Sequence, residues 1–353
     1  MSLIISGIQS LGVGVPDIQR AWDWYGKNLG FTVPVYDAEM RTDLMKTYTG
    51  GAQTGHAVLA LNMQGGGGLA FWQYTSREAK TPAFEIKAGD IGIYAARVKT
   101  SDISKAYESL RGSGAPVYGS ITALPDGTKC FYLSDINNNV IRIEESKESF
   151  MRTKAAAGGL IGAVIGVSNM EMSINFYREV LGYDKLIYDV KGQFLDLPAL
   201  PGGDGSFRRV MLGTSKKGLG SFGRLLGSSG IELIQALGHK PDKILKNRSW
   251  GDSGFIHLCV NVQGISGLRK HCSHRGYKLT VDSSGSGVFN IDKAAGNFAF
   301  IEDPDGNLIK FAEAVKVPLI RKLGLNLKLK KPSREKPLPD WLLKMMRLNA
   351  KRF

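Results

Sequence analysis

Two basic residues stand at matching places, each just after a turn that reverses the chain. Lys310 closes NFAFIEDPDGNLIKF (residues 297–311), where a Pro-Asp-Gly turn separates two stretches of alternating apolar residues. Arg142 closes KCFYLSDINNNVIRI (residues 129–143), where an asparagine run replaces that turn. If both cations point to the inside of the fold, they favour an anionic ligand such as a carboxylate or an enolate, through charge-assisted hydrogen bonds.

Aromatic side chains in predicted strands of the first half are candidates for the wall of a ligand pocket. An apolar wall suits an aromatic or extended ligand, although a single aromatic in a strand more often belongs to the core. His257, in the apolar stretch GFIHLCV, is likewise more often a hydrogen-bonded core residue than a ligand or a base. The aromatic candidates are Trp72, Tyr74, Tyr94 and Tyr132.

The elements that must position these residues occur twice. Residues 11–31 predict a strand, a helix N-cap and a helix that ends at a glycine. Residues 163–183 repeat this pattern at a constant offset of 152, so that Tyr25 corresponds to Tyr177. The two turns lie 168 residues apart, and most of the extra length falls in the glycine-rich segment 202–230, which we interpret as a mobile loop inserted in the second half.

A weaker copy of the same pattern lies inside each half. Residues 91–117 and 254–279 each predict a strand, a helix and glycines that end the helix. Each half therefore consists of two units of strand, helix and several strands. We expect a first domain at 1–148, a linker at 149–159, a second domain at 160–315 and a basic tail at 316–353.

Composition places the chain among soluble globular proteins, with 43% hydrophobic and 22% charged residues. Its three cysteines form no disulfide framework, and no signal peptide or long apolar run is present, so we expect a cytoplasmic protein. The net charge of +14 is concentrated in residues 316–353, which hold twelve Lys or Arg and two acids.

These motifs together resemble the vicinal oxygen chelate superfamily, which includes glyoxalases, extradiol dioxygenases and bleomycin-resistance proteins. The resemblance rests on the repeated Tyr-x-x-x-Leu-Gly helix ending and the closing DPDGNLIKF, and covers about residues 7–315. It implies an α+β fold of four βαβββ modules that form two glyoxalase/dioxygenase-like open β-cups, one from each half. Homodimerisation, common in such a family, stays open here because the internal duplication could replace it.

The resemblance also implies a divalent metal (Fe, Mn, Ni or Zn) on the cup floor, held by residues of the first and last strands of the modules. In the first half these positions fall on residues that are poor ligands: Ser10, Ala70, Ile93 and Arg142. In the second half they fall on Gly162, Glu232, His257 and Lys310. Because an ammonium group would repel a metal ion, we expect Lys310 to pair with Glu232 and the site to be metal-free.

Three functions remain open at this point. In the first, a metal-free enzyme or binding protein uses Glu232 or His257 as base or orienter and Lys310 as electrostatic stabiliser. In the second, Glu232 and His257 hold a metal in a degenerate lyase or dioxygenase site. In the third, the cups bind a ligand without catalysis, as a resistance protein would. In each case we expect the site in the second cup, with Arg142, Tyr94, Tyr132 and Trp72 as further ligand-binding candidates.

The basic tail alternates basic and apolar residues after residue 315. From Asp340 onward, Trp341, Leu342, Met345, Met346 and Leu348 predict a short amphipathic helix. Such a helix could bind an anionic membrane surface or an acidic partner, or it could pack on its own protein. No motif indicates sequence-specific nucleic-acid binding.

Overall fold

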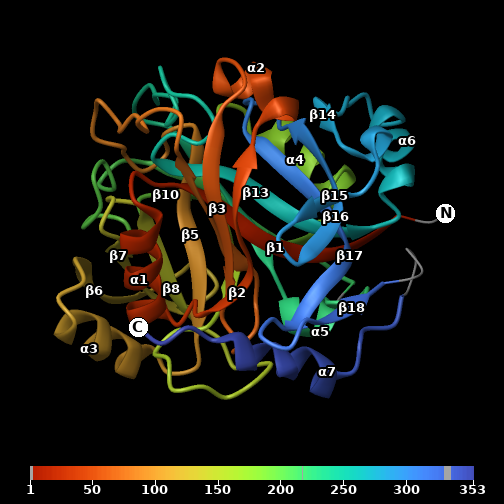
Figure 1. The fold of residues 1–353 in the computed structure, drawn as a ribbon. Helices are drawn as coiled ribbons and strands as arrows, with labels where there is room; N and C mark the ends of the chain where they lie inside the picture. The colour runs from red at the N-terminus through yellow and green to blue at the C-terminus, as the bar shows by residue number, and fades with distance from the viewer. Residues whose placement is uncertain (1–2, 217, 330–334) are drawn as a thin grey trace.

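The computed structural model describes residues 3–216, 218–329 and 335–353 (Figure 1). Its strands form two strongly curved sheets, and each curls into an open cup. We name them cup A and cup B. The fold class predicted from the sequence, an α+β protein with two glyoxalase-like cups, is confirmed.

Cup A contains strands from both ends of the chain. Its order is β14 (Val281–Asp282), β16 (Ala294–Glu302), β17 (Leu308–Ile320), β13 (Gly254–Gln263), β1 (Ile4–Gly14), β4 (Gly68–Tyr74), β3 (Thr54–Leu61) and β2 (Val33–Arg41). Two short strands extend it, β15 (Phe289–Ile291) beside β16 and β18 (Leu325–Lys328) beside β17.

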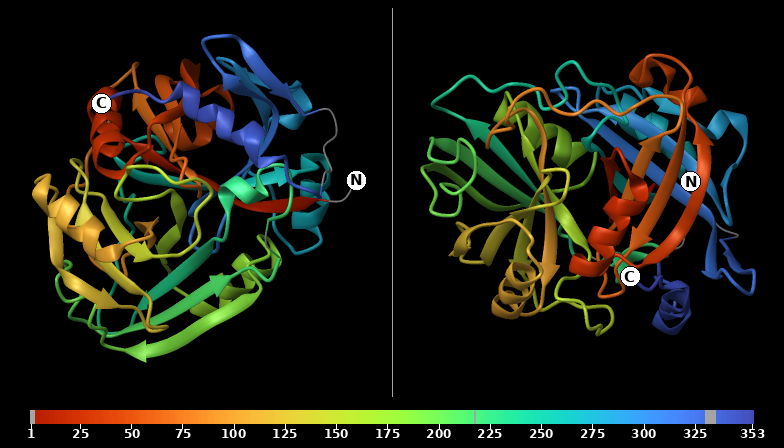
Figure 2. Two further views of the ribbon diagram at one scale, coloured as in Figure 1. Left: turned by 90° about the horizontal axis from the view of Figure 1, so that it is seen from below. Right: turned by 60° about the vertical axis from the view of Figure 1, so that its left-hand side comes forward.

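Cup B is built from the middle of the chain. Its order is β10 (Lys185–Gly192), β11 (Phe207–Gly213), β12 (Gly230–Ala236), β9 (Leu160–Gly166), β5 (Gly92–Thr100), β8 (Val140–Glu145), β7 (Lys129–Ser134) and β6 (Val117–Ala123). Figure 2 shows the division: the red to orange strands β1 to β4 and the teal to blue strands β13 to β18 lie in one cup, and the gold, yellow and green strands between them in sequence lie in the other.

The expectation that each half of the chain forms its own cup is therefore wrong. The first module pairs with the fourth through antiparallel β1 and β13, and the second pairs with the third through antiparallel β5 and β9. A repeat in the sequence shows that four similar modules exist, but all four present equivalent first strands. The pattern cannot say which two of these strands hydrogen-bond.

Helices lie on the outer side of the strands, and the repeat is visible in their caps. In α1 (Ile18–Leu29) the N-cap Asp17 accepts a hydrogen bond from the backbone N–H of Arg20 at 2.9 Å, and in α4 (Met170–Glu179) Asn169 does the same for Met172 at 3.1 Å. The remaining helices are α2 (Lys46–Thr49), α3 (Ile103–Gly112), α5 (Gly223–Leu226), α6 (Leu268–Ser273) and α7 (Asp340–Lys344). Short 3₁₀ helices are η1 (Asp43–Met45), η2 (Ile265–Gly267), η3 (Ser284–Ser286) and η4 (Met345–Asn349).

The two repeated turns form hydrogen bonds between the cups. Tyr25 of cup A donates a hydrogen bond to Asp135 in the turn of cup B, and Tyr177 of cup B donates to Asp303 in the turn of cup A, each at 2.8 Å. Both carboxylates also accept backbone N–H groups of their own turns. The tyrosine of the repeated helix and the aspartate of the repeated turn thus form one cross-link, present twice.

The described part of the tail packs on cup A. Strand β17 continues past residue 315 to Ile320, and Leu343 and Met346 of α7 and η4 are buried in an apolar cluster with Val33 and Leu61. Residues 330–334 of the predicted tail lie outside the described residues. No helix within the described residues is long and apolar enough to cross a membrane.

Candidate ligand site

One row of residues crosses the inner face of cup A on four neighbouring strands. Phe300 on β16 faces Lys310 on β17, which faces Cys259 on β13, which faces Ser10 on β1. The sheet therefore places Lys310 at the centre of the cup floor. Its position after the turn, predicted from the sequence, is the reason for this placement.

A cavity of about 540 Å³ opens above this row. Small residues provide the space: Ala312 and Ala314 follow Lys310 along β17, and Gly296 lies opposite Ala314 on β16. Aromatic side chains surround the part of the cavity near the lysine, and an apolar cluster surrounds another part. The aromatic residues of the lining are Tyr36, Trp72, Phe222, Trp250, Phe289, Phe298 and Phe300. The volume falls within the usual range of small-molecule sites.

Lys310 has no counter-charge of its own. Among the residues that the structure describes, no carboxylate pairs with its ammonium group, which instead lies 5.2 Å from the ring centre of Phe298 and 5.8 Å from that of Phe300. These rings stabilise a cation only partly. Burial lowers the pKa of Lys310, as expected for an ammonium group withdrawn from water. An anionic ligand would supply the missing charge.

His257 lies two residues before Cys259 on β13 and does not line the cavity, because Trp250 and Phe300 cover its ring. Trp250 stacks on its ring and donates a hydrogen bond from Nε1 to His257 Nδ1 at 3.1 Å, while Nε2 has no partner among the described residues. The ring occupies the space left by Gly12, where a Cβ atom would come within 2.3 Å of it. Burial, together with the charge of Lys310, holds the pKa of His257 well below its usual value, so the imidazole is neutral.

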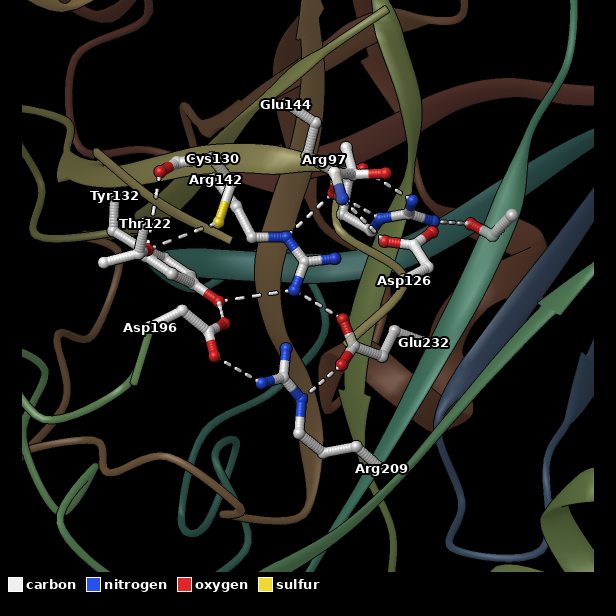
Figure 3. A network of polar contacts seen from close by, with 12 residues as sticks. Arg97, Thr122, Asp126, Cys130, Tyr132, Arg142, Glu144, Asp196, Arg209 and Glu232 are labelled. Carbon is white, nitrogen blue, oxygen red and sulfur yellow. Dashed lines mark hydrogen bonds and ion pairs between the residues drawn. The ribbon is translucent and has the colours of Figure 1, made fainter. Parts of the chain in front are cut away.

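Cup B carries a closed network of charges in place of a cavity floor (Figure 3). Arg142 pairs with Glu232, and its Nε donates to Glu144 at 2.8 Å. Arg97 binds both oxygens of Glu144, at 2.7 and 2.8 Å. Three arginines and three acids are buried together without net charge: Arg97, Arg142, Arg209, Glu144, Asp196 and Glu232.

Glu232 is the centre of this network. Arg209 Nε donates to its Oε1 at 2.5 Å, and Arg142 binds its other oxygen. Burial raises the pKa of Glu232, but the charges of Arg142 and Arg209 outweigh this effect and hold the pKa well below its usual value. The expected pair of Glu232 and Lys310 is therefore wrong, because the two residues belong to different cups.

The structure divides the predicted site residues between the two cups. Lys310, His257 and Trp72 belong to cup A, while Glu232, Arg142, Tyr94 and Tyr132 belong to cup B. Tyr132 hydrogen-bonds to Asp196 at 3.0 Å as part of the network. Arg97 and Arg209 were not predicted as site residues, although charged residues in the apolar stretches GIYAARV and RRVML indicate buried partners.

The residues present do not fit a metal ion. Glu232 and His257 stand in different sheets, both oxygens of Glu232 are bound by arginines, and His257 Nδ1 accepts a hydrogen bond. Within the described residues there is no group of three His, Cys, Asp or Glu side chains that could hold a metal. The hypothesis that Glu232 and His257 share a metal is contradicted by this arrangement.

Comparison with known proteins agrees with the fold. The chain belongs to the glyoxalase/bleomycin resistance protein/dioxygenase superfamily, whose family model matches residues 7–143 and 159–311. A search of curated protein sequences found no match.

Similar solved structures include a putative dioxygenase from Bacillus subtilis, with 13% identity, a TM-score of 0.56 and coverage of 88% of this chain and 85% of that one. Glyoxalase I from Zea mays is similar at 12% identity, with a TM-score of 0.53 and coverage of 88% of this chain and 92% of that one. At these identities the likeness establishes the fold alone.

Proposed function

We propose that cup A binds a small organic anion through Lys310 and does so without a metal ion. The observation that carries this proposal is a lysine without a counter-charge on the floor of a cavity of about 540 Å³. The four acids that line the same cavity already have partners. Asp43 pairs with Arg41, Asp292 with Arg321 and Glu39 with His56, and Glu313 accepts backbone N–H groups of residues 264 and 265. A ligand carboxylate or sulfonate would therefore meet Lys310 without competition from these acids.

The groups beside Lys310 favour binding over proton-transfer catalysis. Burial raises the pKa of the Cys259 thiol to about 11, against the opposing effect of Lys310, and burial also raises the pKa of Tyr36. His257 is neutral but covered by Trp250 and Phe300. None of these groups is both unprotonated at neutral pH and open to the cavity, as a general base would need to be: the thiol and the phenol keep their protons, and the imidazole is covered.

The test uses anilinonaphthalene sulfonate, a fluorescent anion with an apolar body. We expect saturable binding to the wild type, unchanged by a metal chelator. Lys310→Met should weaken it about ten- to a hundred-fold, because a hydrogen bond to a charged group is worth about 1.5–3 kcal/mol. Lys316→Met is the matched control, since Lys316 lies on the same strand and lines the same cavity.

Equal binding to the wild type and Lys310→Met would contradict the proposal. A thermal melt of each variant shows whether the fold is retained. Elemental analysis of protein purified without added metal provides an independent check. A stoichiometric transition metal would contradict the metal-free site.

A further inference from the structure

The cavity of cup A extends beyond the lysine to a group of apolar residues. Its lining includes Leu59 and Leu61 of β3, and Leu225 and Leu226 of α5. These residues belong to one buried apolar cluster, which a compact anion held at Lys310 would leave unused. The volume of about 540 Å³ is far larger than a carboxylate group alone needs.

The C-terminal tail completes this apolar part. Met346 of η4 lines the cavity and is itself buried. Arg321, also from the tail, donates to the carbonyl oxygen of Val35 on β2 at 3.1 Å and pairs with Asp292, beside β15, at 2.7 Å. The tail thereby joins the two edges of the curved sheet over the cup.

Exposed residues mark the other side of the cavity. Glu39, Arg41 and Asp43 line it and face solvent, as does Asn290 beyond them. A ligand that enters here passes the aromatic rings around Lys310 and meets the aliphatic cluster. Such a path matches a molecule with a charged head and an apolar body.

We propose that the ligand of cup A is an amphipathic carboxylic acid, with its carboxylate at Lys310 and an extended apolar body in the pocket sealed by α5 and the C-terminal tail. This inference rests on the proposed function and names its ligand class. It also gives the tail a role as a wall of the site. The small residues Ala312 and Ala314 are then specificity determinants, because they leave the space that the body fills.

The experiment is a calorimetric titration with acetate, octanoate and dodecanoate. Each methylene buried strengthens binding about four-fold at best. We therefore expect acetate to bind weakly or not at all, and dodecanoate to bind at least ten-fold more tightly than octanoate. Lys310→Met should weaken octanoate and dodecanoate by a similar factor, since the head is the same in both.

A second variant tests where the body lies. Ala314→Phe fills the apolar part and should remove most of the advantage of dodecanoate while octanoate still binds. The matched control is Ala350→Phe, because Ala350 is exposed on the tail. Retained octanoate binding and an unchanged melting temperature show that the variant is folded.

The outcomes separate this inference from the proposed function. Equal affinity for octanoate and dodecanoate, or an Ala314→Phe variant that still prefers dodecanoate as the wild type does, would overturn the inference and leave the anion site intact. Binding of every acid unchanged in Lys310→Met would overturn the proposed function itself. If only Lys316→Met lost binding, the ligand carboxylate would lie at Lys316 and not at Lys310, and both the inference and the proposed function would be overturned.

Discussion

Each cup places a basic residue at the equivalent position of its floor, but the neighbours of the two cations differ in charge. In cup B, Arg142 lies between Arg97 on β5 and Tyr132 on β7. In cup A, Lys310 lies between Cys259 on β13 and Phe300 on β16, at the equivalent register. The arginine is neutralised by two glutamates, while the lysine has no acid beside it among the described residues.

The next residue on the same face explains the difference. Two positions after Arg142 stands Glu144, whose carboxylate binds Arg142 and Arg97. Two positions after Lys310 stands Ala312, which adds neither charge nor bulk. This position therefore supplies one of the acids that neutralise the cation in cup B and supplies none in cup A. The comparison indicates that the fold accommodates both a cation neutralised within a buried network and a cation exposed to a cavity.

The largest effect should come from breaking the cup B network. Glu232→Ala leaves Arg142 and Arg209 buried without a shared counter-ion, and we expect a loss of about 3–5 kcal/mol in the free energy of unfolding, measured by urea denaturation. Lys310→Met serves as the contrast, since it removes an unpaired buried ammonium group and should leave stability unchanged or higher. Equal losses in both variants would mean that the two cups do not differ as described.

The second-largest effect should come from a variant that gives Lys310 of cup A an acidic neighbour like the one beside Arg142 in cup B. Ala312→Glu places a carboxylate two residues from Lys310 on the same face, as Glu144 stands to Arg142. The new ion pair would occupy the lysine and lower affinity for anilinonaphthalene sulfonate about ten- to a hundred-fold, the worth of one charged hydrogen bond. Ala312→Gln is the matched control: it adds similar bulk without charge. If both variants lose binding equally, bulk is the cause and not charge.

The same comparison separates the features that local sequence patterns predict from those that depend on long-range pairing. The constant offsets between Tyr25 and Tyr177, and between Arg142 and Lys310, predicted four modules and the equivalence of the two cations, because each depends only on local strand and turn chemistry. The pairing of modules depends on long-range hydrogen bonds between first strands. A local pattern carries no information about such pairing.

Because the pairing of modules was unknown, the prediction that Glu232 and His257 share one site was wrong. Glu232 and His257 both matched ligand types at floor positions, and assigning one cup to each half placed them together. The partners of Glu232 come from β8 and β11, so they could be named only once the sheet order was known. Lys310, by contrast, was identified correctly as a floor position, since its location follows from the turn that precedes it.

A smaller effect separates the cups in their response to pH. His257 of cup A, opposite Gly12, corresponds in register to Ala95 of cup B, opposite Val164, and alanine cannot titrate. Burial lowers the folded-state pKa of His257, so below an unfolded pKa of about 6.5 the unfolded chain binds a proton that the folded chain does not. Stability is therefore lost as the pH falls, by up to about 1.4 kcal/mol per pH unit from this residue.

Urea denaturation between pH 7 and pH 5 measures this contribution. We expect His257→Gln to lose stability less steeply than the wild type as the pH falls, because the variant has no imidazole to protonate. His274→Gln is the control, since the side chain of His274 is exposed. A slope for His257→Gln as steep as that of the wild type would show that the buried imidazole does not resist protonation.

The smallest effect on stability should come from the tyrosine–aspartate hydrogen bonds, which are the same in both cups. Tyr25→Phe and Tyr177→Phe each remove one hydrogen bond of 2.8 Å to a turn aspartate of the other cup. Each aspartate keeps its bonds from the turn, including the Asn139 or Asn307 amide, so we expect a loss of only about 1 kcal/mol from each variant in urea denaturation. Tyr107→Phe, whose hydroxyl bonds the exposed carbonyl oxygen of Gly119, should change stability less. Equal losses for Tyr25 and Tyr177 would show that the cross-links depend on the repeated helix and turn, whatever fills the cup beside them. A much larger loss at one of them would mean that the contents of that cup also hold its turn in place.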